Sequence, residues 1–333
     1  MMLILALLAF PWPVEGTGDL HAIELIPFGE GIAATGHAGS RLLVLDGELR
    51  PALDLTAEEL GVDWFRSIAA DPAEGDLWVL AEDAGPFLFG FDRETLEDTG
   101  GYRAVQISNP VVDGSGRLWF SSDGNLYRDF VDIGLPVCTN GLAVSADGEQ
   151  LAWVDGEDRV WSAKVSDFEP EVVEERRSMA PFYLPTSPVL VVPLLEGGFA
   201  MHMPDGTALE IEEGMQPSWC PVPEGVVYCI SRDDGHNITE SDIYLAAITG
   251  EVLRLTETPE ALETNPSVYD EGLVAVDAAN GCLVVVPDDC LPRASGYRAP
   301  APAHAGSFAQ ELSLLLDALL SPRNPGSPCR PVL

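Results

Sequence analysis

Four amide side chains stand directly before short β-rich runs, and they are the residues best placed to do chemistry. Asn109, Gln216 and Asn265 are each followed by proline, and Asn140 is followed by glycine. Amide oxygens, together with nearby carboxylates, can ligate a divalent metal or hydrogen-bond a sugar. The competing interpretation is capping, because Asn and Gln at strand starts satisfy backbone groups of loops. In a propeller these positions face the mouth of the central channel, so the four residues are candidates for a ligand-binding site there, while capping is the favoured interpretation.

No catalytic or nucleotide-binding motif accompanies these amides. The sequence has no Gly-x-Ser-x-Gly elbow, His-Glu-x-x-His pair, phosphate-binding loop or dinucleotide fingerprint. The histidines are scattered, and His202 stands in an alternating run typical of a strand. Asp233, Asp234 and Asp242 bracket a loop that could hold a calcium ion, although their spacing is not that of an EF-hand. We therefore expect no catalytic residues and no resident cofactor, with a divalent cation such as calcium left open.

The charge of the chain restricts its partners. Asp and Glu total 54 against 17 Lys and Arg, which gives a formal net charge of −37. Such a chain repels phosphate backbones and anionic lipid, so nucleic acid and membrane surfaces are disfavoured. After the first ten residues, no stretch of the sequence approaches the roughly 20 consecutive apolar residues of a membrane-spanning helix. The acidity indicates either a saline habitat or a negative face for a cation or a basic partner. We expect a monomer with a protein or small-molecule ligand.

The N-terminus and the cysteines indicate an oxidising compartment. An apolar run over residues 1–10 is followed by Pro-Trp-Pro, which is typical of a signal peptide and predicts a periplasmic or secreted protein. Six cysteines make an even set, in which two pairs are close in sequence. We predict a hairpin disulfide between Cys220 and Cys229, a small loop closed by Cys282 and Cys290, and leave Cys138 and Cys329 as the remaining candidates. The alternative is free cysteines that fill a core.

A recurring unit of one turn and one strand is the strongest pattern in the sequence. A turn with Asp and Gly precedes a short run that carries a large or apolar marker residue, as in Asp113-Gly-Ser-Gly-Arg-Leu-Trp119. The markers recur at irregular spacings around 40 residues, at Ala34, Trp78, Trp119, Trp153, Met201, Tyr228 and Ala275. One such sheet cannot bury both of its faces, whereas a ring of sheets packs face to face. A β-sandwich does not predict repeated copies of one unit, so we predict an all-β β-propeller, with seven blades favoured and six possible.

Three segments bring family resemblance to this propeller. Gln216-Pro-Ser-Trp with Asp242-Ile-Tyr and Arg254-Leu-Thr resembles the TolB C-terminal repeat, a WD40-like propeller unit. Ser108–Tyr127 is similar to the propeller repeat of sensory two-component regulators, and Asn140–Trp153 to a blade of SMP-30/gluconolactonase propellers. The last resemblance implies that Asn140 is a metal ligand, together with a first-blade glutamate, for which Glu30 is a loose candidate, and a later aspartate. The blade that follows, from Thr186 onward, offers no such aspartate.

These observations define a predicted organisation. A signal peptide spans 1–18, the propeller 19–295, a Pro/Ala-rich linker 296–306, and a short amphipathic C-terminal helix with its tail 307–333. Residues 20–27 either open the first blade or complete the last one as its outer strand. We expect a non-catalytic, exported propeller of TolB-like type that binds a partner on one face. The alternative function is a metal-dependent hydrolase of the lactonase type.

Overall fold

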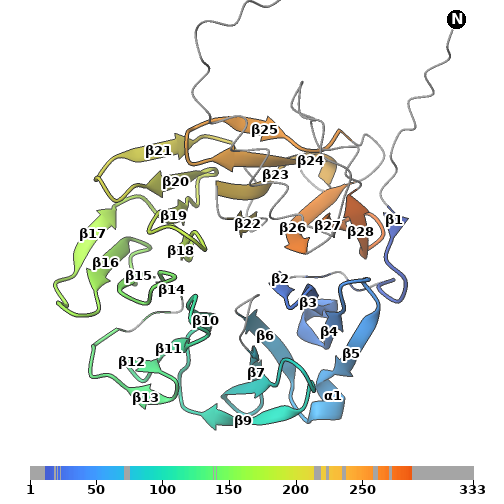
Figure 1. The fold of residues 1–333 in the computed structure, drawn as a ribbon, viewed down its shortest axis with the longest axis horizontal. Coiled ribbons are helices and arrows are strands. Elements are labelled where there is room, and N and C mark those ends of the chain that lie inside the picture. Colours follow the sequence, from blue (N-terminus) through green and yellow to red (C-terminus); the bar gives the residue numbers. More distant parts are fainter. Residues whose placement is uncertain are drawn as a thin grey trace, which may run out of the picture.

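The chain forms a ring of four-stranded antiparallel sheets, as the computed structural model shows (Figure 1). The structure describes residues 12–18, 20, 22, 24–70, 76–137, 139, 141–213, 219–222, 225–234, 238–257, 262–269 and 272–286. Over these residues there are seven sheets, and helix is limited to α1 (Ala57–Leu60) and the 3-10 turn η1 (His37–Gly39). The prediction of a seven-bladed, all-β propeller is confirmed. The predicted linker and C-terminal helix lie outside the described residues.

Each of the first four blades follows the chain outward, so its first strand is innermost. Blade 1 contains β2 (Glu24–Phe28), β3 (Gly31–Gly36), β4 (Arg41–Leu45) and β5 (Pro51–Thr56). Blade 2 contains β6 (Trp64–Ala69), β7 (Leu77–Glu82), β8 (Pro86–Phe91) and β9 (Asp98–Arg103). Blade 3 contains β10 (Val111–Val112), β11 (Leu118–Ser122), β12 (Asn125–Arg128) and β13 (Val131–Asp132). Blade 4 contains β14 (Leu142–Val144), β15 (Gln150–Val154), β16 (Val160–Lys164) and β17 (Glu171–Glu174).

The last three blades repeat this order, except that the last one borrows its outer strand. Blade 5 contains β18 (Phe182–Tyr183), β19 (Leu190–Pro193), β20 (Phe199–His202) and β21 (Ala208–Ile211). Blade 6 contains β22 (Trp219–Val222), β23 (Gly225–Asp233), β24 (Ile238–Ala247) and β25 (Val252–Arg254). Blade 7 contains β26 (Glu263–Tyr269), β27 (Gly272–Asp277), β28 (Cys282–Val286) and β1 (Trp12–Pro13).

The N-terminal strand closes the ring. Trp12 pairs with Val285 in antiparallel register, and the Val14 amide donates to the Leu283 carbonyl at 2.8 Å. The buried Thr17 hydroxyl accepts from the Leu283 amide at 3.0 Å. The expectation of closure by an N-terminal strand is therefore confirmed, but the strand lies upstream of residues 20–27, and β2 opens blade 1. Cleavage after residue 18 would remove β1, so we expect any signal peptide to end before Trp12.

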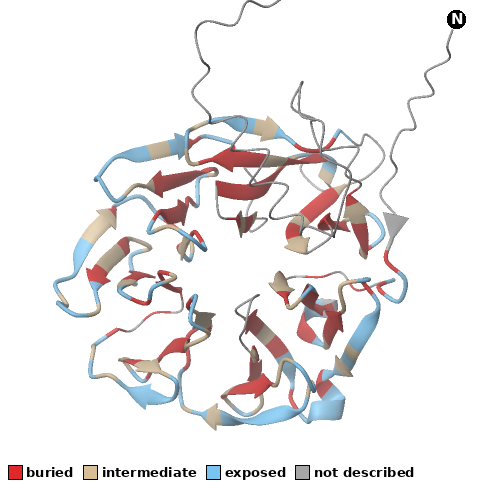
Figure 2. Ribbon diagram, in the orientation of Figure 1, coloured by how far each residue is buried: buried red, intermediate tan, exposed pale blue. Residues whose placement is uncertain are grey.

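The hydrophobic core is divided among the seams between blades. Each of the seven clusters of buried apolar side chains draws mainly on two neighbouring blades, as with Val79 of blade 2 and Val44 of blade 1. Middle strands are consequently buried while most outer strands are exposed (Figure 2). This explains the repeat, because every blade needs apolar side chains on both faces.

A buried aspartate fixes the turn of the sequence repeat. The Asp113 carboxylate accepts from Arg117 Nε at 2.7 Å and from the Trp119 indole at 2.9 Å. Asp155 repeats this arrangement with the Trp161 indole at 2.8 Å. Burial alone would raise the pKa of the Asp155 carboxyl, but hydrogen bonds from Trp161 and the neighbouring arginine outweigh burial and hold that pKa well below its usual range. The Asp-Gly turn with its arginine and tryptophan is thus a folding device.

The structure corrects the predicted disulfide between Cys220 and Cys229. Cys220 pairs with Val227 in the β22–β23 hairpin, so Cys229 lies on the diagonal, two residues beyond Val227. Both are free, buried thiols in the core between blades 6 and 7, and burial raises the pKa of Cys220 to about 11. Cys282 is also free and only half-buried, while Cys138, Cys290 and Cys329 lie outside the described residues. The core-filling interpretation holds for this hairpin.

Candidate binding face

The antiparallel blades give the ring two distinct faces. Connections between consecutive blades and the turns between second and third strands share one end, which we call the connecting face. The turns from first to second and from third to fourth strands form the opposite, hairpin face. Loops on a rigid scaffold commonly carry binding residues. The connecting face is therefore where the predicted amides have to be judged.

The structure describes only some of the four predicted amides. Asn109 is half-buried in the connection from β9 to β10, on the connecting face. Asn140 and Gln216 lie outside the described residues. The channel-mouth site stays a prediction for these three residues.

Asn265 has a structural contact that supports the capping interpretation for this residue. It stands at a bulge within β26, in the left-handed region with φ 46°. Its Nδ2 donates to the carbonyl of Ala22 at 2.9 Å, in the segment that leads into β2. The amide thus ties blade 7 to blade 1 next to the point of closure. Asparagine suits this position because it tolerates positive φ and carries a donor.

Glu24 is an acidic group on the inner wall of the ring that the sequence analysis did not single out. It begins β2, and its carboxylate accepts from the Ile68 amide of β6 at 2.9 Å, linking the innermost strands of blades 1 and 2. Removal from water raises the pKa of Glu24 to about 7, although the hydrogen bond from Ile68 opposes the rise. By its exposed surface the side chain is half-buried, so water in the ring still reaches it. The sequence signal that could have identified Glu24 was a single acid within an otherwise apolar strand.

The lactonase-type ligand set is only partly described. Glu30 lies in the turn between β2 and β3, on the hairpin face. Asn140, the other candidate ligand, lies outside the described residues. The described residues contain no group of three or more His, Cys, Asp or Glu side chains suited to a metal ion.

The predicted calcium loop is only partly described. Asp242 is paired with Arg254, whose Nη2 lies 2.7 Å from Asp242 Oδ2. This pair joins the Asp-Ile-Tyr segment of β24 to the Arg-Leu-Thr segment after β25, and so gives the TolB-like repeat a structural reason. Residues 235–237 of the loop lie outside the described residues, so calcium binding there stays a prediction.

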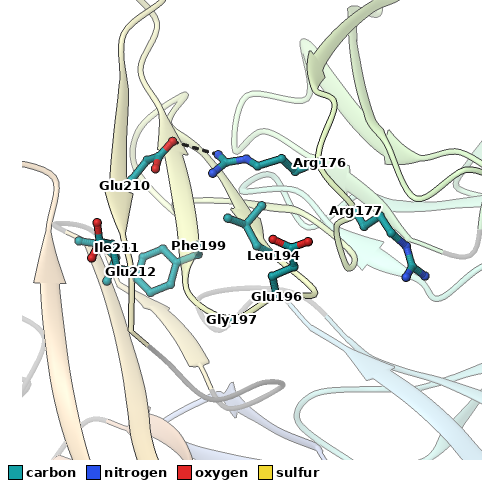
Figure 3. Close-up of a pocket in the computed structure, with 9 residues that line it drawn as sticks. All are labelled: Arg176, Arg177, Leu194, Glu196, Gly197, Phe199, Glu210, Ile211 and Glu212. Carbon is teal, nitrogen blue, oxygen red and sulfur yellow. Dashed lines mark ion pairs between the residues drawn. The ribbon is translucent and has the colours of Figure 1, made fainter.

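A pocket of about 240 Å³ opens on the connecting face between blades 4 and 5 (Figure 3). Three of its apolar side chains are buried: Leu194, Phe199 and Ile211. Charged side chains complete the lining, together with Gly197: Arg176, Arg177, Glu196, Glu210 and Glu212. The pocket therefore combines an apolar floor with a charged rim.

The two arginines of this rim are already held by acids of the protein. Arg176 Nη2 lies 2.7 Å from Glu174 Oε2 and 3.1 Å from Glu210 Oε1. Its hydrogen bond to Glu174 raises the pKa of Arg176 despite partial burial. Arg177 Nη2 lies 2.8 Å from Asp158 Oδ2, and Figure 3 shows this side chain extending away from the others. Neither guanidinium can bind an anionic ligand unless it first gives up its ion pair with one of these acids.

His202 of blade 5 lies beside Glu174, the acid that holds Arg176. Its Nε2 lies 3.6 Å from Glu174 Oε2, too far for a hydrogen bond, and that nitrogen has no hydrogen-bond partner among the described residues. Burial is the largest influence on His202 and lowers its pKa, so the ring is neutral near pH 7. The strand position expected for His202 is confirmed, because it is the last residue of β20.

Sequence reasoning missed the pocket, although one signal was present. Arg176 and Arg177 are adjacent in a chain with few basic residues, and they follow two glutamates. The partner Glu210 is distant in sequence and belongs to blade 5, so only the packing of blade 5 against the segment after blade 4 brings it to Arg176.

Comparison with known proteins identifies the fold class and no narrower group. No protein-family model and no curated protein matches the chain. A chain in the crystal structure of the mitotic checkpoint complex is similar with a TM-score of 0.59 and 14% identity, over 84% of this chain and 91% of that one. A streptogramin B lyase is similar with a TM-score of 0.54 and 12% identity, over 83% and 95%.

A third similar structure comes from a bacterial surface protein. PorZ, of the type-IX secretion system of Porphyromonas gingivalis, matches with a TM-score of 0.54 and 10% identity, over 84% of this chain and 39% of that one. At such identities the likeness establishes the propeller fold alone, because one propeller scaffold hosts many activities. No described helix is long and apolar enough to cross a membrane.

Proposed function

We propose that this chain is a non-catalytic, exported propeller that binds a protein or small-molecule partner across its connecting face. The observation that carries the proposal is the pocket between blades 4 and 5, which opens on the same face as Asn109. A rigid ring held by seven apolar seams offers a preformed surface, which lowers the cost of ordering on binding.

Export is supported by the apolar N-terminal run and by the structural likeness to PorZ, which is described as a bacterial surface component. The likeness is an analogy of fold. The hydrolase alternative has less support, because the blade that starts near Thr186 offers no aspartate as a third ligand.

Site-specific photocrosslinking in the native host tests this proposal. A photoreactive amino acid replaces Leu195, which is 42% exposed on the connecting face, or Val131, which is 63% exposed beside a turn of the hairpin face. We expect one discrete adduct from position 195 and none from position 131. Native mass spectrometry of the same preparation would reveal a retained small ligand. Adducts of equal yield from both faces, or no adduct and no retained ligand, would refute the proposal.

A further inference from the structure

The pocket between blades 4 and 5 has a size that restricts its occupant. Pockets for whole small molecules occupy roughly 300–1,000 Å³, whereas this one measures about 240 Å³. It is therefore better matched to one side chain of a larger partner. This step, like those that follow, rests on the proposed binding function.

The lining selects a side chain that is apolar along its stem and charged at its end. Leu194, Phe199 and Ile211 are each less than a tenth exposed and provide an apolar surface. Lysine and arginine bury their methylene stems against such surfaces and keep the charged end at a polar rim. An acidic side chain is too short to span both zones and would meet the carboxylates.

The charge of the rim is negative once the internal ion pairs are counted. Glu174 and Glu210 hold Arg176, while Asp158 holds Arg177. That leaves Glu196 and Glu212, both exposed and without an ion-pair partner among the described residues.

Two observations reinforce this selection. The two glutamates come from different elements, the β19–β20 turn and the connection after β21, and both line the pocket. The net charge of −37 on the chain would also steer a cationic partner towards it.

We infer that this pocket receives a lysine or arginine side chain of a basic protein partner, with its stem on Leu194, Phe199 and Ile211 and its cationic end between Glu196 and Glu212. The contact would act as an anchor point on the connecting face. Its strength should fall with added salt, because the rim is exposed to solvent.

Methyl NMR of the full chain tests this inference with defined probes. The methyl groups of Ile211 and Leu194 report directly on the pocket. The probes are acetyl-Gly-Arg-Gly-amide, acetyl-Gly-Lys-Gly-amide and the isosteric neutral peptide acetyl-Gly-citrulline-Gly-amide. We expect saturable shifts of both methyl groups with a basic peptide, and much smaller shifts with citrulline.

Two double variants with the same change in net charge separate the effect of the rim glutamates on binding from the effect of the net charge. Glu196→Gln with Glu212→Gln should weaken the basic peptide about tenfold or more, because charge-assisted contacts are lost. Glu169→Gln with Glu171→Gln makes the same charge change on the hairpin face and should leave binding unchanged.

Three results would overturn the inference. The first is no shift of the pocket methyl groups, and the second is equal binding of the citrulline peptide. The third is a stronger response to magnesium or calcium chloride than to either basic peptide, which would assign the pocket to a free cation. A negative result here leaves the crosslinking test of the connecting face unaffected, so the two proposals can fail separately.

Discussion

Replacing Glu24 by glutamine should stabilise the folded chain at alkaline pH and leave its stability unchanged in acid. The Glu24 carboxyl has its pKa raised from 4.5 to about 7, because it is taken out of water beside the first strand of the next blade. Between these two pH values the folded chain keeps a proton that the unfolded chain has lost. The free energy of unfolding therefore falls as the pH rises through this window.

The size of the effect follows from the same shift. One pKa unit corresponds to about 1.4 kcal/mol, which sets an upper bound of about 3 kcal/mol above neutral pH. Water in the ring reaches the half-buried side chain and screens its charge, so we expect about 1–2 kcal/mol. For a domain of this size that is a rise in Tm of roughly 2–8 °C for the glutamine variant. The amide oxygen of glutamine still accepts from Ile68, whereas Glu24→Ala loses that contact.

Thermal and denaturant unfolding at about pH 5 and about pH 8 measure this effect. Wild type, Glu24→Gln and the exposed control Glu169→Gln are compared at both pH values, because the many other acids also change the stability with pH. We expect the Glu24 variant to exceed wild type only at the higher pH, and the control to follow wild type at both. Identical pH profiles for wild type and Glu24→Gln would refute the argument that burial of this carboxyl destabilises the folded chain.

Four further predictions concern the contacts that hold the ring together. Asp113→Ala should cost about 2–4 kcal/mol in denaturant unfolding, because it leaves the buried Trp119 indole and Arg117 without their acceptor; a loss under about 1 kcal/mol would contradict this account of the turn. Asn265→Ala should destabilise more than Asn265→Gly, because both lose the contact with Ala22 but only alanine is strained at φ 46°; equal melting temperatures would show that φ is relieved. Thr17→Val should lower the free energy of unfolding by about 1–3 kcal/mol, because it leaves the buried Leu283 amide without its acceptor. Deletion of residues 1–17 should lower the cooperativity of unfolding. An unchanged calorimetric transition after this deletion would mean that β1 contributes nothing to closure. Cys220 and Cys229 should resist alkylation in the folded chain and react in denaturant without a reductant; thiols that appear only after reduction would show that the two are bonded.

Much of the propeller was predictable because its signals are local. Turns with Asp and Gly, followed by β-rich runs, identified the repeat in most blades. The markers that lie on the second strand of their blades are Trp78, Trp119, Trp153, Tyr228 and Ala275. Ala34 does so as well. A turn and the strand that follows it depend on neighbouring residues, so a single sequence contains the information needed to find them.

Blade 5 shows the limit of that local pattern. The marker Met201 lies on β20, the third strand of the blade, whereas the second strand is β19. The turn before β19, around residues 185–188, contains two prolines and no Asp-Gly pair, so the pattern matched the next hairpin instead. The number of blades was still right because the error stayed within one blade.

The cysteine hairpin failed for a related reason. The sequence placed Cys220 and Cys229 on facing strands, but pairing of Cys220 with Val227 put the two thiols on a diagonal within an apolar core. Strand register is set by packing between blades, and a shift of one residue changes which side chains face each other.

The sequence by itself determined the repeated four-stranded unit and the strongly negative charge, because each depends on composition or on contacts within one repeat. The tertiary structure decided which strand closes the ring, that Glu210 of blade 5 pairs with Arg176, and that Glu24 meets the strand of the next blade. These contacts join segments that are far apart in the sequence, so they form only when the blades pack together. The pocket between blades 4 and 5 belongs to the same class, since blade 4 supplies its arginines and blade 5 its floor.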